Sequence, residues 1–261
     1  MNYETLLHEQ RGPVAWITLN RPGERNAVNP RMVDELHYVL TAVQADASVH
    51  VVVLTGAGAA FCAGADLKAV LAGLDAETGD SEFASRTQAM LRRLRHLPKP
   101  VIAAVNGLAI AGGLELAMCC DLVIAAASAR IGDGHANFGV FPGGGGAAVL
   151  PRKVGLNRAK QLLFTGDLFD AAQLEAWGLV NEVVPDAELP GRVEALAARI
   201  AAKSSLLLRR MKDVADHSLD QSLEAALSHE MLECRQHLRS EDFREGLTAF
   251  CEKRAPVFRG T

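Results

Sequence analysis

Three apolar runs constrain this chain more than any other feature of its sequence. They are Val49–Leu54, which only His50 interrupts, Val101–Val105 and Leu122–Ala126. A strand with one face in water alternates apolar and polar residues, whereas a continuous apolar run is typical of a strand covered on both faces. The first two runs each lead through a loop of small residues into a helical pattern. This alternation predicts an α/β core over residues 1–185.

The N-terminal part of the core has patterns of its own. Residues 3–8 and 13–19 predict two strands joined by a turn at residues 9–12, because apolar and polar side chains alternate in the second of them. Asn29 followed by Pro30 is typical of the first residues of a helix, since asparagine caps a helix N-terminus and proline fits its first turn.

The last third of the chain is helical in pattern almost to its end. The candidate helices lie near residues 187–202, 204–216, 220–238 and 240–252. These segments contain too few apolar positions to predict a separate domain with its own core. We therefore divide the chain into the core of residues 1–185 and a C-terminal helical region of residues 186–261, which we expect to cover the core or a neighbouring subunit.

Composition narrows the class of protein. Apolar residues make up 49% of the 261 residues and charged residues 22%, a balance typical of globular proteins. The formal net charge of −4 gives no global basic field for nucleic acid. No run of about 18 apolar residues is present, and the N-terminus has no basic segment followed by an apolar one, so we expect a cytoplasmic protein without a membrane partner. None of the five cysteines forms a CxxC pair, so we expect no metal site.

Two glycine-rich segments fail the tests for phosphate-binding loops. The loop after the first apolar run has Phe61 where a dinucleotide fingerprint needs its third glycine. The segment Pro142–Gly146 is not followed by Gly-Lys-Ser or Gly-Lys-Thr, as a P-loop would be. Such glycines form turns or let the backbone approach a ligand closely, and composition alone favours turns.

Two other loops together indicate a specific chemistry. Ala63–Lys68 and Ile110–Glu115 each join a buried strand to a helix, which exposes backbone amides at a helix N-terminus. Two such amides that converge would form an oxyanion hole, with a contribution of about 2.7–4 kcal/mol per donor. Two ordinary strand-to-helix turns are the alternative, and the spacing alone leaves it open.

A longer resemblance runs through nearly the whole chain. Its segments, in order, are residues 19–27 (LNRPGERNA), 61–68 (FCAGADLK), 100–107 (PVIAAVNG), 112–122 (GGLELAMCCDL), 138–143 (FGVFPG) and 241–254 (EDFREGLTAFCEKR). Each motif is moderately specific, and their order and spacing together are highly specific. With them the chain resembles the enoyl-CoA hydratase/isomerase family, the crotonases.

The resemblance implies a fold, an assembly and a substrate. The fold is a spiral of ββα units with a C-terminal helical trimerisation region, and the assembly is a homotrimer or a dimer of trimers. The substrate is an acyl-CoA thioester, so coenzyme A arrives as part of the substrate and no separate cofactor is expected. The resemblance places the oxyanion amides at Ala65 and Gly112, and it implies that residues 69–90 line the acyl pocket.

The resemblance also implies contacts with the coenzyme A portion. The implied residues are Arg25, Ala27, Ala63, Ala65, Asp66, Leu67, Lys68, Gly112 and Lys253. Ala63 and its neighbouring backbone would receive the adenine with Arg25 nearby. Lys253 would reach the phosphates, across a subunit interface in one arrangement. A solvated charge on a helix is the alternative for Lys253.

Glu115 matches the first catalytic glutamate of the family. An acid in the first turn of a helix is also favoured by the helix dipole alone. The apolar neighbours Leu114, Leu116 and Ala117 predict that the helix is buried, where unpaired acids are rare. This setting favours a functional role for Glu115.

His135 marks the departure from the family. Aligned without a gap, it occupies the position where hydratases and isomerases have their second glutamate, and Asp133 two residues away is no assured substitute. A lone histidine is often structural, but histidine also serves as a general acid or base near neutrality. The candidate catalytic residues are therefore Glu115 and His135, with the amides of Ala65 and Gly112.

Hydration of a trans-2-enoyl-CoA is the first functional hypothesis, with Glu115 positioning water and His135 donating a proton. The second is C–C bond hydrolysis, because some β-diketone hydrolases of the superfamily have a histidine at this position. Those hydrolases also have an aspartate in the following segment, where this chain has Gly144. Isomerisation depends on the glutamate that His135 replaces. A catalytically weak acyl-CoA-binding protein is the alternative from another class.

Overall fold

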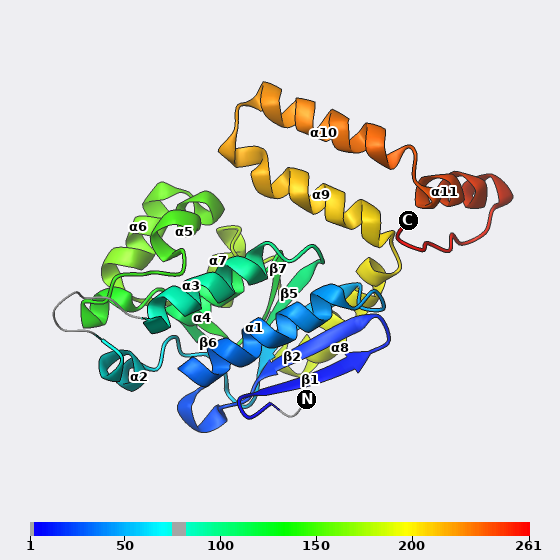
Figure 1. Cartoon of the computed structure of the whole chain (residues 1–261). Coiled ribbons are helices and arrows are strands. Elements are labelled where there is room, and N and C mark those ends of the chain that lie inside the picture. Colours follow the sequence, from blue (N-terminus) through cyan, green and yellow to red (C-terminus); the bar gives the residue numbers. More distant parts are fainter. Residues whose placement is uncertain (1–2, 75–81) are drawn as a thin grey trace.

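A computed structural model describes residues 3–74 and 82–261, and two sheets form its core. The larger sheet has the strand order β1 (Leu6–Arg11), β2 (Val14–Leu19), β3 (Val51–Gly56), β5 (Val101–Val105), β7 (Leu122–Ala126), β10 (Glu182–Val184). β1 and β2 pair antiparallel, and every other neighbouring pair in this sheet is parallel (Figure 1). The predicted α/β class is confirmed.

The smaller sheet gives the fold its spiral. Its order is β4 (Ala60–Cys62), β6 (Leu108–Ile110), β8 (Arg130–Gly132), β9 (Leu168–Asp170). β3, β5 and β7 of the larger sheet are each followed within a few residues by β4, β6 and β8 of the smaller one. A helix follows β4 and β6 in turn, so the chain repeats a ββα unit as the resemblance implied.

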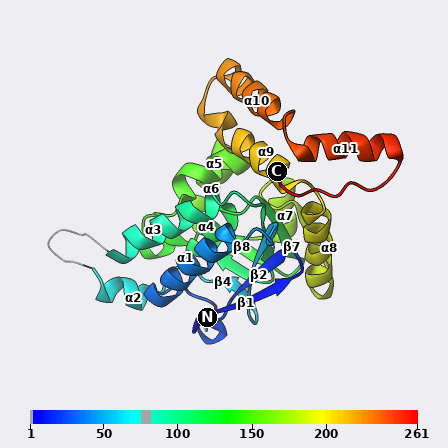
Figure 2. The ribbon, with the colours of Figure 1, turned by 45° about the vertical axis from the view of Figure 1, so that its right-hand side comes forward.

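The described residues also form helices, most of which pack around the sheets. They are α1 (Pro30–Ala45), α2 (Leu67–Ala72), α3 (Glu82–Arg95), α4 (Gly112–Met118), α5 (Gly146–Val154), α6 (Leu156–Thr165), α7 (Ala171–Ala176), α8 (Leu189–Ala201), α9 (Ser205–His217), α10 (Leu223–His237) and α11 (Glu241–Glu252). The predicted start of α1 is confirmed, because the Asn29 side chain accepts a hydrogen bond of 2.9 Å from the Met32 amide. In Figure 2, α8 lies on one side of the larger sheet, and α1 and α3 lie on the other.

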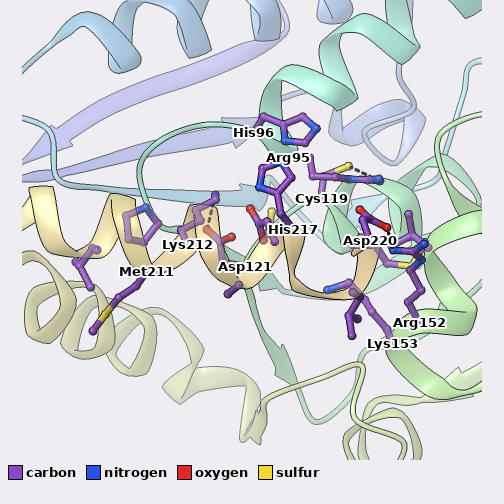
Figure 3. A pocket seen from close by; sticks show the side chains of 18 of the residues that line it. Arg95, His96, Cys119, Asp121, Arg152, Lys153, Met211, Lys212, His217 and Asp220 are labelled. Atoms are coloured by element: carbon purple, nitrogen blue, oxygen red, sulfur yellow. Dashed lines mark hydrogen bonds and ion pairs between the residues drawn. The ribbon is translucent and has the colours of Figure 1, made fainter. Parts of the chain in front are cut away.

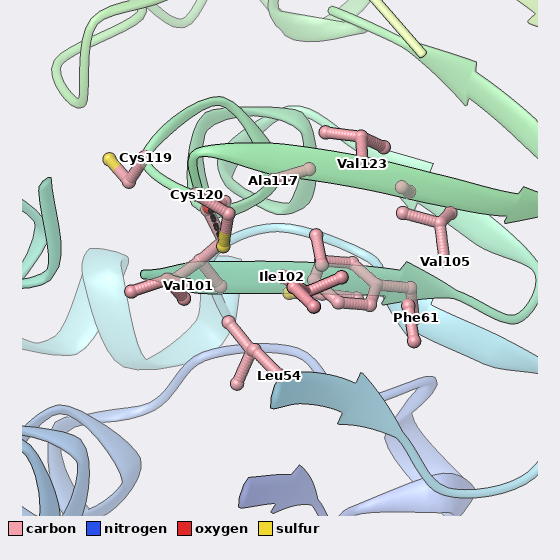
Figure 4. Close-up of a cluster of buried hydrophobic side chains, with 14 of the residues drawn as sticks. Leu54, Phe61, Val101, Ile102, Val105, Ala117, Cys119, Cys120 and Val123 are labelled. Atoms are coloured by element: carbon pink, nitrogen blue, oxygen red, sulfur yellow. Dashed lines mark hydrogen bonds between the residues drawn. The ribbon is translucent and has the colours of Figure 1, made fainter. Parts of the chain in front are cut away.

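This two-sided cover explains the apolar runs. All five residues of β5 are buried, as are the first four of β3. Figure 4 shows side chains of the neighbouring strands packed together with Phe61 and with Ala117 of α4. Cys119 and Cys120 are buried free thiols beside this cluster, which agrees with their interpretation as small core residues.

The N-terminal hairpin differs from its prediction. β1 runs through Arg11, so the turn lies at Gly12 and Pro13 and not at residues 9–12. The polar residues that suggested an early turn, Glu9 and Gln10, pair instead with Trp16 and Ala15 of β2. They fit a strand because β1 is the edge of the sheet and these side chains are exposed.

The C-terminal helices differ in their relation to the sheets. α8 packs on the larger sheet, against β2, β3, β5 and β7. α9, α10 and α11 extend beyond the core in both views of the ribbon (Figures 1 and 2). The division at residues 185 and 186 stays a prediction. Within residues 3–74 and 82–261, no helix is long and apolar enough to cross a membrane.

Candidate active site

Close contact between α4 and β4 brings the two predicted loops together. A Cβ atom on Gly113 would lie 2.1 Å from the carbonyl oxygen of Cys62, so only glycine allows this approach. The same contact places Gly112 against the second loop. A Cβ atom on Gly112 would lie 3.3 Å from the α-carbon of Gly64 and 3.4 Å from the amide nitrogen of Ala65. The structure therefore brings Ala65 and Gly112 side by side.

Both amides are available to a ligand. Gly112 is the first residue of α4, so its N–H has no acceptor within the helix. Around Ala65, the Val28 amide donates to the Gly64 carbonyl and the Asp66 amide donates to the Val28 carbonyl. Among the described residues, this pairing leaves the Ala65 amide without a protein acceptor. Two adjacent free donors have the geometry that can stabilise a developing oxyanion.

Ala111 turns the chain sharply before α4. Its φ of 54° and ψ of −118° are a conformation that residues with a Cβ atom rarely adopt. The Ala111 amide donates a 3.1 Å hydrogen bond to the Gly132 carbonyl of β8, which holds the turn in place. Backbone strain of this kind often occurs where an active site needs a fixed amide direction.

Glu115 lies one turn into α4, and its side chain is 4% exposed. Its Oε1 atom accepts two backbone hydrogen bonds, of 2.7 Å from Gly144 and 2.9 Å from Gly146. Burial raises the pKa of Glu115, while the two amides and the charge of His135 oppose that rise. The carboxylate is thus fixed in direction and is more basic than an exposed glutamate.

His135 follows β8 in a 3₁₀ turn, His135–Phe138. Its ring Nδ1 lies 3.1 Å from Oδ2 of Asp133, whose side chain is 1% exposed. Burial lowers the pKa of His135, but the hydrogen bond to Asp133 and the charges of Asp133 and Glu115 outweigh it, so the pKa is raised. The arrangement therefore favours the imidazolium form.

The close packing around Gly146 accounts for a glycine in the run after Pro142. A Cβ atom on Gly146 would lie 2.9 Å from Oδ2 of Asp133 and 3.4 Å from Oε1 of Glu115. The run allows the backbone to pass between two buried carboxylates, a role beyond the turn that composition favoured. Sequence reasoning missed the amide donors Gly144 and Gly146 and the pairing of Asp133 with His135. The two-residue spacing of Asp133 and His135 was the one local signal for that pair.

Most residues implied for coenzyme A lie next to the amides. The Ala63 amide donates a 2.9 Å hydrogen bond to the Arg25 carbonyl, and Arg21 bonds to both the Ala27 carbonyl and Asp66. These bonds fasten residues 25–27 beside residues 63–66. Leu67 and Lys68 are exposed in the first turn of α2, which starts at that loop.

Lys253 is separate from this group in the isolated chain. It follows α11, which lies across the molecule from α2 in both ribbon views (Figures 1 and 2). Its implied contact with coenzyme A therefore stays a prediction for a neighbouring subunit. Of the segment expected to line the acyl pocket, residues 75–81 lie outside the described residues.

A cavity of about 860 Å³ lies elsewhere, between α9 and the ends of α3, α4 and α5 (Figure 3). Its walls include Arg95, Lys153 and Lys212 but none of the paired amides, Glu115 or His135. Lys212 is already paired with Asp121 at 2.8 Å. The candidate active site is at the amides, because free donors and acid–base groups lie close together there.

Comparison with known proteins agrees with this fold. Residues 9–261 match the family model described as enoyl-CoA hydratase/isomerase. Crotonyl-CoA hydratase of Syntrophomonas wolfei is 40% identical over 259 residues, 99% of each chain. The short-chain-enoyl-CoA hydratase of Clostridium acetobutylicum is 37% identical over 255 residues, 97% of each chain.

A solved structure gives the same result. Enoyl-CoA hydratase from Bacillus anthracis has a TM-score of 0.94 at 36% identity, covering 99% of this chain and 100% of that one. The two sheets and the repeated ββα unit are thus a crotonase fold. The chain belongs to the enoyl-CoA hydratase/isomerase family.

Proposed function

We propose that this protein is an enoyl-CoA hydratase, which adds water reversibly to a trans-2-enoyl-CoA. Relatives with full-length similarity are named as crotonyl-CoA and short-chain-enoyl-CoA hydratases. The observation that carries the proposal is the buried carboxylate of Glu115, fixed by two amides and one helical turn from the free amide of Gly112. A hydratase needs this combination of a base and an oxyanion hole.

The paired amides act on the thioester. When water adds to the β-carbon, negative charge moves onto the thioester oxygen, which accepts hydrogen bonds from Ala65 and Gly112. Donors of this kind contribute about 2.7–4 kcal/mol each when they bind the transition state better than the substrate. Because both are backbone groups on packed elements, they need no reorganisation during the reaction.

Glu115 and His135 move the protons. Glu115 takes a proton from water as the oxygen bonds to the β-carbon, and its raised pKa makes it a better base. His135, as the imidazolium, donates its Nε2 proton to the α-carbon, because Nδ1 is engaged with Asp133. The proton on Glu115 then returns to the histidine through solvent, so the net reaction consumes one water molecule.

Coenzyme A binding is part of the same proposal. Arg25, Ala27, Ala63, Asp66, Leu67 and Lys68 would bind the adenine end of the substrate, and Lys253 of a neighbouring subunit would reach its phosphates. Support comes from the hydrogen bonds that hold residues 25–27 beside residues 63–66. Coenzyme A then enters only as part of the substrate.

We also propose that the protein acts in the cytoplasm.

We also propose that the protein self-associates as a homotrimer or a dimer of trimers, and the C-terminal helices support this proposal. Large apolar side chains on α10 and α11 are exposed, Leu223 by 72% and Phe250 by 83%. Exposed apolar surface of this extent usually marks a protein interface. Sedimentation at micromolar concentration should give a trimer or hexamer, and a monomer would contradict the proposed assembly.

A substrate screen tests the function. The pure protein is incubated with short, long and aromatic trans-2-enoyl-CoAs, and the absorbance of the conjugated thioester is followed. We expect turnover of at least one of them in the range of about 1–10³ per second. Tight binding of every acyl-CoA without turnover would support the binding-protein alternative instead. A β-diketone is assayed separately, and its consumption without turnover of any enoyl-CoA would support C–C hydrolysis.

A further inference from the structure

Asp133 is a buried carboxylate, and within the described residues its only hydrogen-bond partner is His135. Oδ2 lies 3.1 Å from Nδ1 of His135, and Oδ1 accepts from the His135 backbone amide at 3.3 Å. In the described part of the chain, no lysine or arginine forms an ion pair with Asp133. A buried charge is rare unless it is paired, so His135 is the group that compensates it.

The backbone between the two residues is shaped for this contact. Gly134 has a φ of 67°, which turns the chain so that the ring of His135 reaches back to the carboxylate. A Cβ atom on Gly134 would lie 2.5 Å from Cδ1 of Ile110, so the turn is packed against β6. The pair is thus held by a tight, glycine-dependent turn.

Glu115 completes the cluster from α4. Oxygen atoms of Asp133 and Glu115 both lie within 3.4 Å of one point, the Cβ position of Gly146. Two carboxylates this close repel each other when both are ionised, and a cation beside them relieves the repulsion. Asp133, from its own turn, and Glu115, from the facing helix, are the charged groups that act on the ring of His135.

We propose that Asp133 is a positioning residue that fixes the tautomer and orientation of His135, so that Nε2 carries the proton delivered to substrate. The proposal rests on the proposed hydratase function for its catalytic consequence. Neutral histidine has two tautomers, and the one present is set by the hydrogen bond of the other ring nitrogen. The Nδ1–H group donates its hydrogen bond to Asp133 and keeps its proton throughout. Nε2 gives its proton to the substrate α-carbon and regains a proton afterwards.

Nuclear magnetic resonance of ¹⁵N-histidine-labelled protein tests the proposal without turnover. In the wild type we expect His135 to show the Nδ1–H tautomer when neutral. Asp133→Asn keeps an oxygen that accepts from Nδ1 but removes the charge, so His135 should titrate at lower pH. Asp133→Ala removes the acceptor as well and should give mixed tautomers. Asp186→Asn is the matched control, because Asp186 is an exposed carboxylate bonded to Ser128.

Turnover adds a second readout. We expect kcat to fall about 10–10²-fold in Asp133→Asn and further in Asp133→Ala, with little change in KM, since the effect acts in the transition state. The alkaline limb of the kcat profile should move to lower pH in Asp133→Asn. If Asp133→Ala does not fold, Asp133→Asn alone tests the proposal, through the pH at which His135 titrates and through the position of the alkaline limb of the kcat profile.

The outcomes separate the two proposals. Wild-type ring signals and an unmoved alkaline limb in folded Asp133→Asn would overturn the positioning role, whatever the activity of the wild type. A wild type without hydratase turnover, but with the expected tautomer and its loss in Asp133→Ala, would overturn the hydratase function and leave the positioning of His135 supported.

Discussion

The amide of Gly144 donates a 2.7 Å hydrogen bond to Oε1 of Glu115. In the part of the chain that the structure describes, the carboxylate is therefore held by a glycine loop and not by a lysine or arginine. Burial raises the pKa of Glu115 and outweighs the two amides, which lower it, so the direction of the carboxylate is fixed while its pKa stays raised. We therefore expect the shape of the loop between Pro142 and α5 to control the reactivity of Glu115.

Gly146→Ala tests this control by the loop. The added Cβ atom would meet Pro142 Cβ at 2.8 Å and Asp133 Oδ2 at 2.9 Å, so the loop must shift. We expect kcat to fall about 10–10²-fold, because displacements of about 1 Å at a catalytic group have effects of this size. Gly143→Ala is the control, since nothing lies within 4 Å of a Cβ atom there. Equal kcat values for the two variants would show that the loop does not control the reactivity of Glu115.

The pH profile of kcat follows from two raised pKa values. Glu115 must be ionised, and burial raises its pKa, so activity should fall with decreasing pH through a pKa higher than that of an exposed glutamate. His135 must be protonated, and Asp133 raises its pKa against the effect of burial, so activity should fall with increasing pH above about 6.5. His135→Gln should remove the alkaline limb. A wild-type rate that keeps rising through pH 9 would contradict this assignment.

His135→Ala should lower kcat by about 10²–10⁴-fold with a smaller change in KM. His135→Glu alone should not restore the rate, because it places a third carboxylate beside buried Asp133 and Glu115. The double variant Asp133→Asn/His135→Glu should be faster than His135→Glu, since it removes the extra charge. Rates are normalised to folded protein, and equal rates for wild type and His135→Ala would leave His135 without a catalytic role.

Ala111→Gly should increase the free energy of unfolding by about 1 kcal/mol, since glycine adopts a φ of 54° without strain. Ala109→Gly, two residues earlier in β6, is the control. Its side chain is fully buried, so we expect a loss of about 1–2 kcal/mol. Urea unfolding at one fixed protein concentration measures both. A loss in Ala111→Gly as large as that in Ala109→Gly would mean that Ala111 is not strained.

Local sequence patterns were sufficient for much of the fold. The apolar runs predicted β3, β5 and β7 because each is covered on both faces, and Asn29 predicted the start of α1. α5 was not indicated, because it begins in a glycine run and contains Pro151, both typical of loops. Its helix is decided by packing against α4 and α6, which a local pattern does not record.

The sequence also predicted only part of the candidate site. Glu115 was predicted as buried from its apolar neighbours, and the structure places it at 4% exposure. The approach of Gly146 to the carboxylate of Glu115 depends on segments 31 residues apart meeting in space. No periodicity encodes such a contact, so the glycines had two open interpretations. The pairing of Asp133 with His135 required the φ of Gly134, which the sequence permits but does not specify.

Hydration of a short trans-2-enoyl-CoA by wild type and Glu115→Gln is the most direct test of the central claim. Glutamine keeps an oxygen that accepts from the amides of Gly144 and Gly146, so the loop should stay in place while the base is lost. We predict turnover by the wild type and a kcat about 10²–10⁴-fold lower for Glu115→Gln, with KM within about threefold. A folded Glu115→Gln variant that hydrates the substrate as fast as the wild type would contradict the account.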